Sequence, residues 1–271
     1  MLTQALGRLA TRTRQGLLGP LGVLWRERDL LGVLFRRDMA VRTSGTLFGG
    51  LWMFVQPALQ VVAFWFLLDF VLRVRFPGAV PFLHYFLAGM IPWQMMADAM
   101  NRSVYLMGEF APLYARAVFP LPLLPLLPPL VAGAIYGVVY TLVMLVLEGP
   151  ASAALAPLVI IALMLWLMPV CYLLSLVGVF VRDLAQAIPF LITIVFYLTP
   201  ILYMPEMLPE RAQDWMILNP FADLMASVHG VLQGTEAGLG NVLRPLAVWL
   251  VLLGPAWVLF HRATPHIREA L

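Results

Sequence analysis

Two amides and two aromatic rings lie four residues apart along one apolar stretch. Trp52, Gln56, Gln60 and Phe64 occupy positions i, i+4, i+8 and i+12. In an α-helix this spacing places all four on one face, drifting by about 40° per step. Amides in hydrocarbon need hydrogen-bond partners. The four residues therefore suit a translocation wall that offers hydrogen bonds and flat rings to sugars. The alternative is amide bonding between helices beside a kink at Pro57.

Aromatic residues repeat at helical spacing in a second apolar stretch. Phe190 and Tyr197 lie seven residues apart, and Phe196 and Tyr203 repeat the spacing on a neighbouring face. Pairs of this kind usually pack or form interfacial belts. On these residues alone, a role in lining a glycan path is one of two open interpretations.

Asp98 and Arg102 form a charged pair spaced i, i+4 within an apolar segment. Such spacing predicts an ion pair between them, which lowers the cost of burying charge in a membrane. We favour this structural pairing over a role in binding a substrate.

The residue types that are missing exclude several kinds of chemistry. All 17 basic residues are arginine, so neither a P-loop, which needs a lysine, nor a Schiff-base enzyme can form. The single cysteine, Cys171, excludes an intrachain disulfide and a cysteine-cluster metal site, and the four histidines are scattered. The sequence contains no Gly-x-Ser-x-Gly, His-Glu-x-x-His or paired-aspartate motif. We expect no catalysis, no metal and no cofactor on this chain.

Composition places these residues in a bilayer. Of 271 residues, 62% are hydrophobic and 11% are charged, against roughly 25% charged in soluble domains. With about 20 apolar residues per span, the chain has room for about six spans. The fold class is thus an all-α polytopic membrane protein. Hydropathy predicts spans at residues 47–72, 83–106, 121–147, 155–181, 185–202 and 242–260. Residues 1–46 form a cytoplasmic amino-terminal segment, and residues 47–271 form the transmembrane domain.

The arginines predict the orientation of the chain. With the amino terminus inside and six spans, 13 of the 17 arginines face the cytoplasm. Arg8, Arg12 and Arg14 stand where a signal peptide would have its apolar run, so we expect an uncleaved amino terminus. Both termini are predicted to be cytoplasmic.

Three segments are predicted to depart from a plain spanning helix. Between residues 25 and 42, apolar residues at helical spacing alternate with arginines, which favours an amphipathic helix on the inner membrane surface or a simple anionic-lipid anchor. Five prolines within residues 120–129 predict an irregular start of the third span. Residues 203–230 are too polar to span and too apolar for a free loop, which favours short re-entrant helices in the outer leaflet.

Three segments also carry more specific sequence. They are Phe35-Arg36-Arg37-Asp38 running on to Gln56-Pro57, then Leu87-Ala88-Gly89-Met90-Ile91-Pro92-Trp93 with Phe119-Pro120, and then Phe180-Val181-Arg182-Asp183-Leu184 with Thr199-Pro200-Ile201-Leu202-Tyr203, Leu208-Pro209 and Asn219-Pro220. In this order and spacing they resemble the permease subunit of the bacterial ABC exporters for O-antigen, teichoic-acid and capsular polysaccharides.

The resemblance implies an assembly in the bacterial plasma membrane. It implies a homodimer of permeases above two P-loop ABC ATPase subunits that bind ATP and Mg²⁺, with a lipid-linked glycan as substrate and no nucleic acid. The residues it places at the ATPases are Arg36, Arg37, Glu109, Tyr114, Arg116, Arg182 and Asp183. The external gate falls at Pro200, Pro209, Trp215, Asn219 and Pro220. The translocation path falls at Trp52, Gln56, Gln60, Phe64, Phe196, Tyr197 and Tyr203.

Two other functions fit the same residues. The 15 methionines could form an adaptable wall for small hydrophobic drugs or lipids. An ion-coupled secondary transporter would need an intramembrane carboxylate, for which Asp69 and Asp98 are the candidates.

Overall fold

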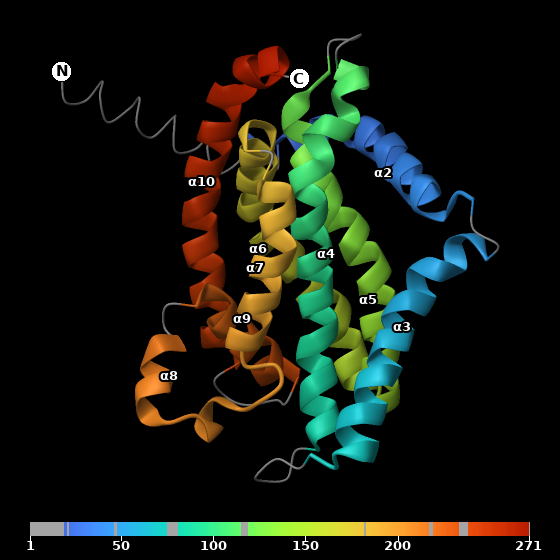
Figure 1. Ribbon diagram of the computed structural model, residues 1–271, viewed down its shortest axis with the longest axis vertical. Coiled ribbons are helices and arrows are strands. Elements are labelled where there is room, and N and C mark those ends of the chain that lie inside the picture. The colour runs from blue at the N-terminus through green and yellow to red at the C-terminus, as the bar shows by residue number, and fades with distance from the viewer. Residues whose placement is uncertain are drawn as a thin grey trace.

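The computed structural model describes residues 19–20, 22–45, 48–74, 81–114, 119–181, 183–216, 219–232 and 238–270. Within these ranges the chain is built from helices joined by short connections (Figure 1). The helices are α2 (Arg28–Thr43), η1 (Gly49–Leu51), α3 (Trp52–Trp65), η2 (Phe66–Val71), α4 (Phe82–Tyr114), η3 (Leu121–Leu126), α5 (Leu127–Leu147), α6 (Pro150–Phe180), α7 (Leu184–Leu198), η4 (Pro205–Met207), α8 (Glu210–Met216), α9 (Pro220–Leu232) and α10 (Gly238–Ala270).

Helices stand at all six segments that hydropathy predicts. α4 continues past residue 106 to Tyr114, and α10 extends beyond both predicted ends. α7 ends earlier than predicted, at Leu198, where Thr199 takes an extended backbone conformation. Among the described residues, three helical stretches are long and apolar enough to cross a membrane by length and composition alone: Gly49–Val71, Leu121–Leu147 and Pro150–Phe180.

The centre of the bundle consists of α4, α5 and α6, which pack against one another, with α10 packed on α6 and α9. Trp166, Tyr140 and Phe86 are fully buried there. α2 lies across the end of the bundle where α10 also ends, whereas α8 lies at the opposite end (Figure 1). The described helices thus form a bundle with α2 at one end and α8 at the other.

Gly178 fixes how closely α6 approaches α4. A Cβ atom built on Gly178 would lie 2.3 Å from the backbone oxygen of Val104. Backbone atoms cannot move aside as a flexible side chain can, so only glycine fits at this crossing. The two helices are therefore held in close contact at one point.

α3 and α7 are much less covered than the central helices. In the apolar window of Gly49–Val71 only 11% of the residues are buried, against 50% in that of Pro150–Phe180. Large apolar side chains are exposed on both helices, including Leu59 and Val62 on α3 and Phe190 and Tyr197 on α7. Each helix presents an uncovered apolar face within the single chain.

The three irregular segments are helical in the described regions. α2 buries Leu31 and Leu34, as expected of its apolar face, but it also buries Asp38, which the pattern did not predict. The segment predicted as the third span begins as the 3₁₀ helix η3, which confirms the irregular start predicted from its prolines. Between α7 and α10 the chain forms η4, α8 and α9, which are short helices as predicted.

Candidate functional site

A cavity of about 390 Å³ lies among α3, α4, α5 and α7. On α4, the polar residues Gln94, Asp98 and Asn101 line it at positions i, i+4 and i+7, which share one helix face. Gln60 of α3 and Thr193 of α7 add polar groups from the neighbouring helices. Its remaining lining is apolar and aromatic: Phe64, Met90, Trp93, Ala97, Tyr136, Pro189, Ile192 and Phe196.

Three of the seven residues predicted for the translocation path line this cavity, namely Gln60, Phe64 and Phe196. The Phe196 ring lies 5.8 Å from the Trp93 ring between centroids, so α4 and α7 contact each other through aromatic side chains. Trp52 and Gln56 are exposed on α3 and line none of the cavities described here.

The other two predicted path residues lie in a second cavity. Tyr197 and Tyr203 line a hollow of about 880 Å³ at the other end of α7, together with the predicted gate residues Trp215, Asn219 and Pro220. Arg211 also lines it, as does apolar surface from α8 and α9. The predicted path residues are thus divided between two hollows.

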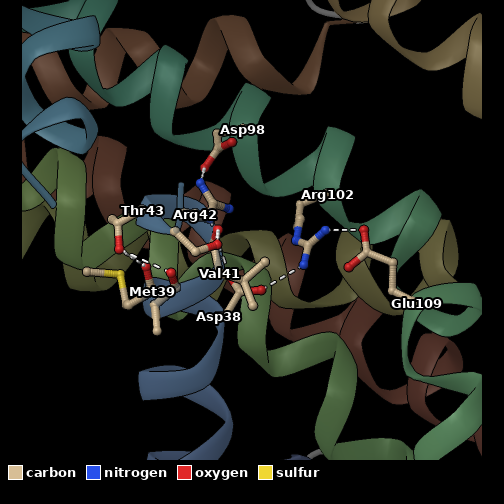
Figure 2. A network of polar contacts seen from close by, with 10 residues as sticks. Asp38, Met39, Val41, Arg42, Thr43, Asp98, Arg102 and Glu109 are labelled. Carbon is tan, nitrogen blue, oxygen red and sulfur yellow. Dashed lines mark hydrogen bonds and ion pairs between the residues drawn. The ribbon is translucent and has the colours of Figure 1, made fainter. Parts of the chain in front are cut away.

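A network of charged side chains joins α2 to α4 (Figure 2). Asp38 of α2 is only 3% exposed, and it accepts hydrogen bonds from Arg102 Nη2 at 2.7 Å and from Arg42 Nε at 3.3 Å. Arg42 also donates from Nη1 to Asp98 Oδ2 at 2.9 Å, and Arg102 also donates to the Glu109 carboxylate. Three carboxylates therefore share two guanidinium groups.

The predicted pairing of Asp98 with Arg102 is wrong. Asp98 pairs with Arg42, 56 residues away, and Arg102 pairs with Asp38 and Glu109. The reason is the position of α2, which brings Asp38 and Arg42 against α4. A buried carboxylate requires full pairing, and two arginines satisfy Asp38.

The residues predicted to contact the ATPases lie in several places. Arg36 and Arg37 are exposed on α2, and the Arg37 guanidinium lies 4.9 Å from the centre of the Phe110 ring. Asp183 is exposed at the start of α7, and Tyr114 is the last residue of α4. Arg116 and Arg182 lie outside the described residues.

The predicted gate contains a clamp centred on Asn219. Its Nδ2 donates to Thr199 Oγ1 at 3.0 Å and to the Leu198 carbonyl at 3.2 Å, while its Oδ1 accepts from the backbone N–H of Phe221 at 3.0 Å. Asn219 therefore caps the start of α9 and ties it to the end of α7. Pro200 and Pro220 lie beside this clamp, whereas Pro209 is exposed just before α8.

A buried histidine, not predicted as part of the gate, reinforces this end. His229 of α9 stacks on the Tyr85 ring of α4, with centroids 3.8 Å apart, and its Nε2 donates to the Tyr85 carbonyl at 3.0 Å. The Tyr85 hydroxyl donates to the Pro200 carbonyl at 3.0 Å. Burial lowers the pKa of His229 to about 4, so the ring is neutral near pH 7.

The sequence contained a usable signal for some of the missed residues and none for others. Gln94 and Asn101 recur at helical spacing with Asp98, so the face that they share could have been found. Asp38 and His229 carry no such pattern. Among the described residues, no three His, Cys, Asp or Glu side chains gather closely enough to hold a metal ion.

Comparison with known proteins identifies relatives over most of the chain, although no family model matches it. Two proteins from Klebsiella pneumoniae, each named O-antigen export system permease protein RfbA, are 28% and 29% identical over 205 residues, covering 73% of this chain and 78% of each relative. A Myxococcus xanthus protein of the same name is 26% identical over 258 residues, covering 92% of this chain and 97% of that relative. Together with the helical fold of the described residues, these matches support a permease of the type-2 ABC exporters.

Proposed function

We propose that this chain is the membrane subunit of an ATP-driven exporter that moves a lipid-linked polysaccharide of the O-antigen type outward across the bacterial plasma membrane. The observation that carries the proposal is the cavity among α3, α4, α5 and α7, which combines amides with aromatic rings. Amides bond sugar hydroxyls, and rings stack on the apolar faces of sugars. The relatives named as O-antigen export permeases support the same cargo.

The proposed topology has six spans: α3 with η2, α4, α5 with η3, α6, α7 and α10. α2 then lies on the cytoplasmic surface, at the end of the bundle where α10 also ends (Figure 1). The arginines support this orientation because Arg36, Arg37, Arg42 and Arg262 fall at or near that end. α8 and α9 then lie at the external end as the gate.

Energy reaches this chain from two copies of a P-loop ABC ATPase that bind ATP and Mg²⁺. The 271 residues contain no lysine and cannot form a P-loop, which supports a separate ATPase subunit. The exposed Arg36 and Arg37 on α2 offer the ATPase a charged surface, and the ion-pair network transmits a displacement of α2 to α4.

The permease acts as a homodimer in this proposal. α3 and α7 both carry uncovered apolar faces, and both line the cavity. Pairing of two copies through these faces would cover Leu59, Val62 and Phe190 and would place the two cavities near the twofold axis. A path for a polymer is then built from both copies.

The test is glycan export by cells that express both subunits. The chain and a candidate partner ABC ATPase are expressed in cells that make a lipid-linked glycan but lack their own exporter, and surface glycan is measured. We expect surface glycan only when both subunits are present and the P-loop lysine of the ATPase is intact. Glycan export without an active ATPase would overturn the proposal in favour of an ion-coupled transporter.

A paired variant separates glycan export from export of small hydrophobic drugs. Replacing Gln56 and Gln60 by Leu removes two amides from α3 and keeps its length and apolar character. Glycan export should fall, whereas efflux of an apolar dye would persist if drugs were the cargo. Unchanged glycan export in the double variant would remove α3 from the proposed path.

A further inference from the structure

The polar side of the cavity contains hydrogen-bonding groups that the protein itself does not use. Gln94 is only 8% exposed, and its Nε2 has no hydrogen-bond partner in the described part of the chain. The Oδ1 atom of Asn101 is likewise buried and without a partner there. Leaving such groups unpaired costs roughly 1–3 kcal/mol each. Their presence on one face of α4 indicates a ligand or water that completes them.

Further acceptors converge on the same space. Asp98 uses Oδ2 to accept from Arg42, and among the described residues its other oxygen has no protein donor. Thr193 also lines the cavity, and because it donates its hydroxyl proton to the Pro189 carbonyl, its Oγ1 remains only as an acceptor. The cavity therefore offers amide donors together with several oxygen acceptors, which suits hydroxyl groups, since each hydroxyl both donates and accepts.

The charge of the lining excludes an anionic ligand. No arginine lines the cavity, and Asp98 is its only acidic residue. The adjoining network already holds three carboxylates against two guanidinium groups. A phosphate or carboxylate entering here would meet net negative charge with no free cation to pair with. The lining thus disfavours an anionic ligand, and its unpaired amide groups fit the hydroxyls of a neutral one.

The aromatic rings in the lining favour a sugar over water alone as the occupant of the cavity. Trp93 and Phe196 form a tilted aromatic pair, and Phe64 adds a third ring from α3. Rings beside convergent amides and a carboxylate match the two surfaces of a pyranose, which has apolar faces and a polar rim.

We propose that the cavity among α3, α4, α5 and α7 binds one neutral sugar unit of the cargo, with Gln94 donating to a hydroxyl and Asp98 and Asn101 accepting from hydroxyls. This inference rests on the proposed function and assigns the sugar contacts to α4, outside the residues predicted for the path. Loss of one of these hydrogen bonds should weaken sugar binding by about threefold to tenfold.

The single cysteine makes a direct test practical. Cys171 is fully buried, so a Cys171→Ala background permits a reporter thiol at Ala97→Cys, which lines the cavity without removing a polar group. The full transporter, with its ATPase inactivated at the P-loop lysine, is labelled with a permeant maleimide in two strains. One strain makes the complete lipid-linked glycan, and the other makes the carrier lipid without the sugar.

We expect Ala97→Cys to be labelled at least about threefold more slowly in the strain that makes the glycan. Gln94→Leu should remove this protection, whereas Met95→Leu, a volume-conserving change at a buried neighbour outside the lining, should retain it. A thiol at Ala187→Cys, exposed on α7 outside the lining, should label equally in both strains.

Equal labelling in the two strains would overturn the inference and indicate a cavity filled by water alone. Equal protection by the sugar-free carrier lipid would also overturn it, because an acyl chain would then be the occupant. Measuring glycan export distinguishes failure of this inference from failure of the proposed function. Normal glycan export by a Gln94→Leu, Asn101→Leu double variant would refute the sugar site and leave the proposed function standing. Failure of the unsubstituted chain to export glycan would refute the function itself.

Discussion

Arg42 Nη1 on α2 lies 2.9 Å from Asp98 Oδ2 on α4, and the same Asp98 lines the cavity that we assign to a sugar. One carboxylate therefore belongs both to the contact between the surface helix and the bundle and to the lining of the cavity (Figure 2). A shift of α2 along α4 changes the donors available to Asp98, and hence its capacity to accept from a ligand.

The Arg42–Asp98 pair should couple ATP hydrolysis to export. In Arg42→Ala, we expect ATP hydrolysis by the assembled transporter to continue while glycan export falls about tenfold, because α2 loses its bonds to both Asp38 and Asp98. Thermal unfolding of Arg42→Ala, Asp98→Ala and the double variant should give a coupling free energy of about 0.5–3 kcal/mol.

Arg28→Ala is the matched control for this prediction. Arg28 lies on the same helix, but its side chain is 64% exposed and is 3.9 Å from the fully exposed Asp29. Such a surface pair contributes little to stability. Additive effects of Arg42→Ala and Asp98→Ala would show that the pair does not couple the two helices.

Because α6 crosses α4 closely at Gly178, alanine at Gly178 and alanine at Gly108 should affect the free energy of unfolding very differently. Gly178→Ala should lower the free energy of unfolding by more than about 2 kcal/mol, since its Cβ would meet the Val104 backbone oxygen at 2.3 Å. Gly108→Ala, on α4 with nothing within 4 Å, should be neutral or stabilise by up to about 1 kcal/mol. Detergent-solubilised variants can be compared by thermal unfolding, and equal midpoints would contradict the close crossing.

The clamp centred on Asn219 predicts a measurable loss for Asn219→Ala. The variant loses the cap of α9 and two hydrogen bonds to the end of α7, which should cost about 1–2 kcal/mol. Limited proteolysis of the segment from residue 199 to residue 232 should then become faster. Gln213→Ala removes one exposed hydrogen bond, to the Leu208 carbonyl, and should change the rate little. Equal rates for the two variants would contradict the role of Asn219.

His229 should make the attachment of α9 sensitive to acid. Burial lowers its pKa to about 4 in the folded protein, below its ordinary value of 6.5, so the folded state binds fewer protons than the unfolded state. The stabilisation is complete above about pH 6.5 and is lost as the pH falls toward 4. His229→Phe keeps a ring against Tyr85 but does not titrate. The fall in unfolding midpoint between pH 6.5 and 4.5 should be steeper in the unsubstituted protein, and identical slopes would refute this.

Hydropathy and helical spacing predicted the helices well because apolar length is a local property of the sequence. The six predicted segments all coincide with helices. The irregular start at η3 and the short helices α8 and α9 were also predicted. Helix ends were less accurate: α4 continues past residue 106 to Tyr114, and Glu109 in this extension is paired with Arg102 of the same helix.

The partners of charged and polar groups could not be predicted, because they depend on which helices meet. Arg42 and Asp98 are separated by 56 residues, and their contact follows only from the placement of α2 on α4. Gln60, Phe64 and Phe196 were predicted as one path and do share a cavity, but Tyr197, one residue after Phe196, points into the other hollow because successive helical residues diverge by about 100°.

The close contact at Gly178 also limits which parts of the chain can move. The Cβ position of Gly178 on α6 lies against the Val104 backbone of α4, so one helix cannot slide along the other at this point. α3 and α7, in contrast, have few neighbours within the chain and border the cavity from outside that rigid pair. We therefore expect that α4, α5 and α6 keep their relative positions during a transport cycle, while α3 and α7 move as rigid helices against them.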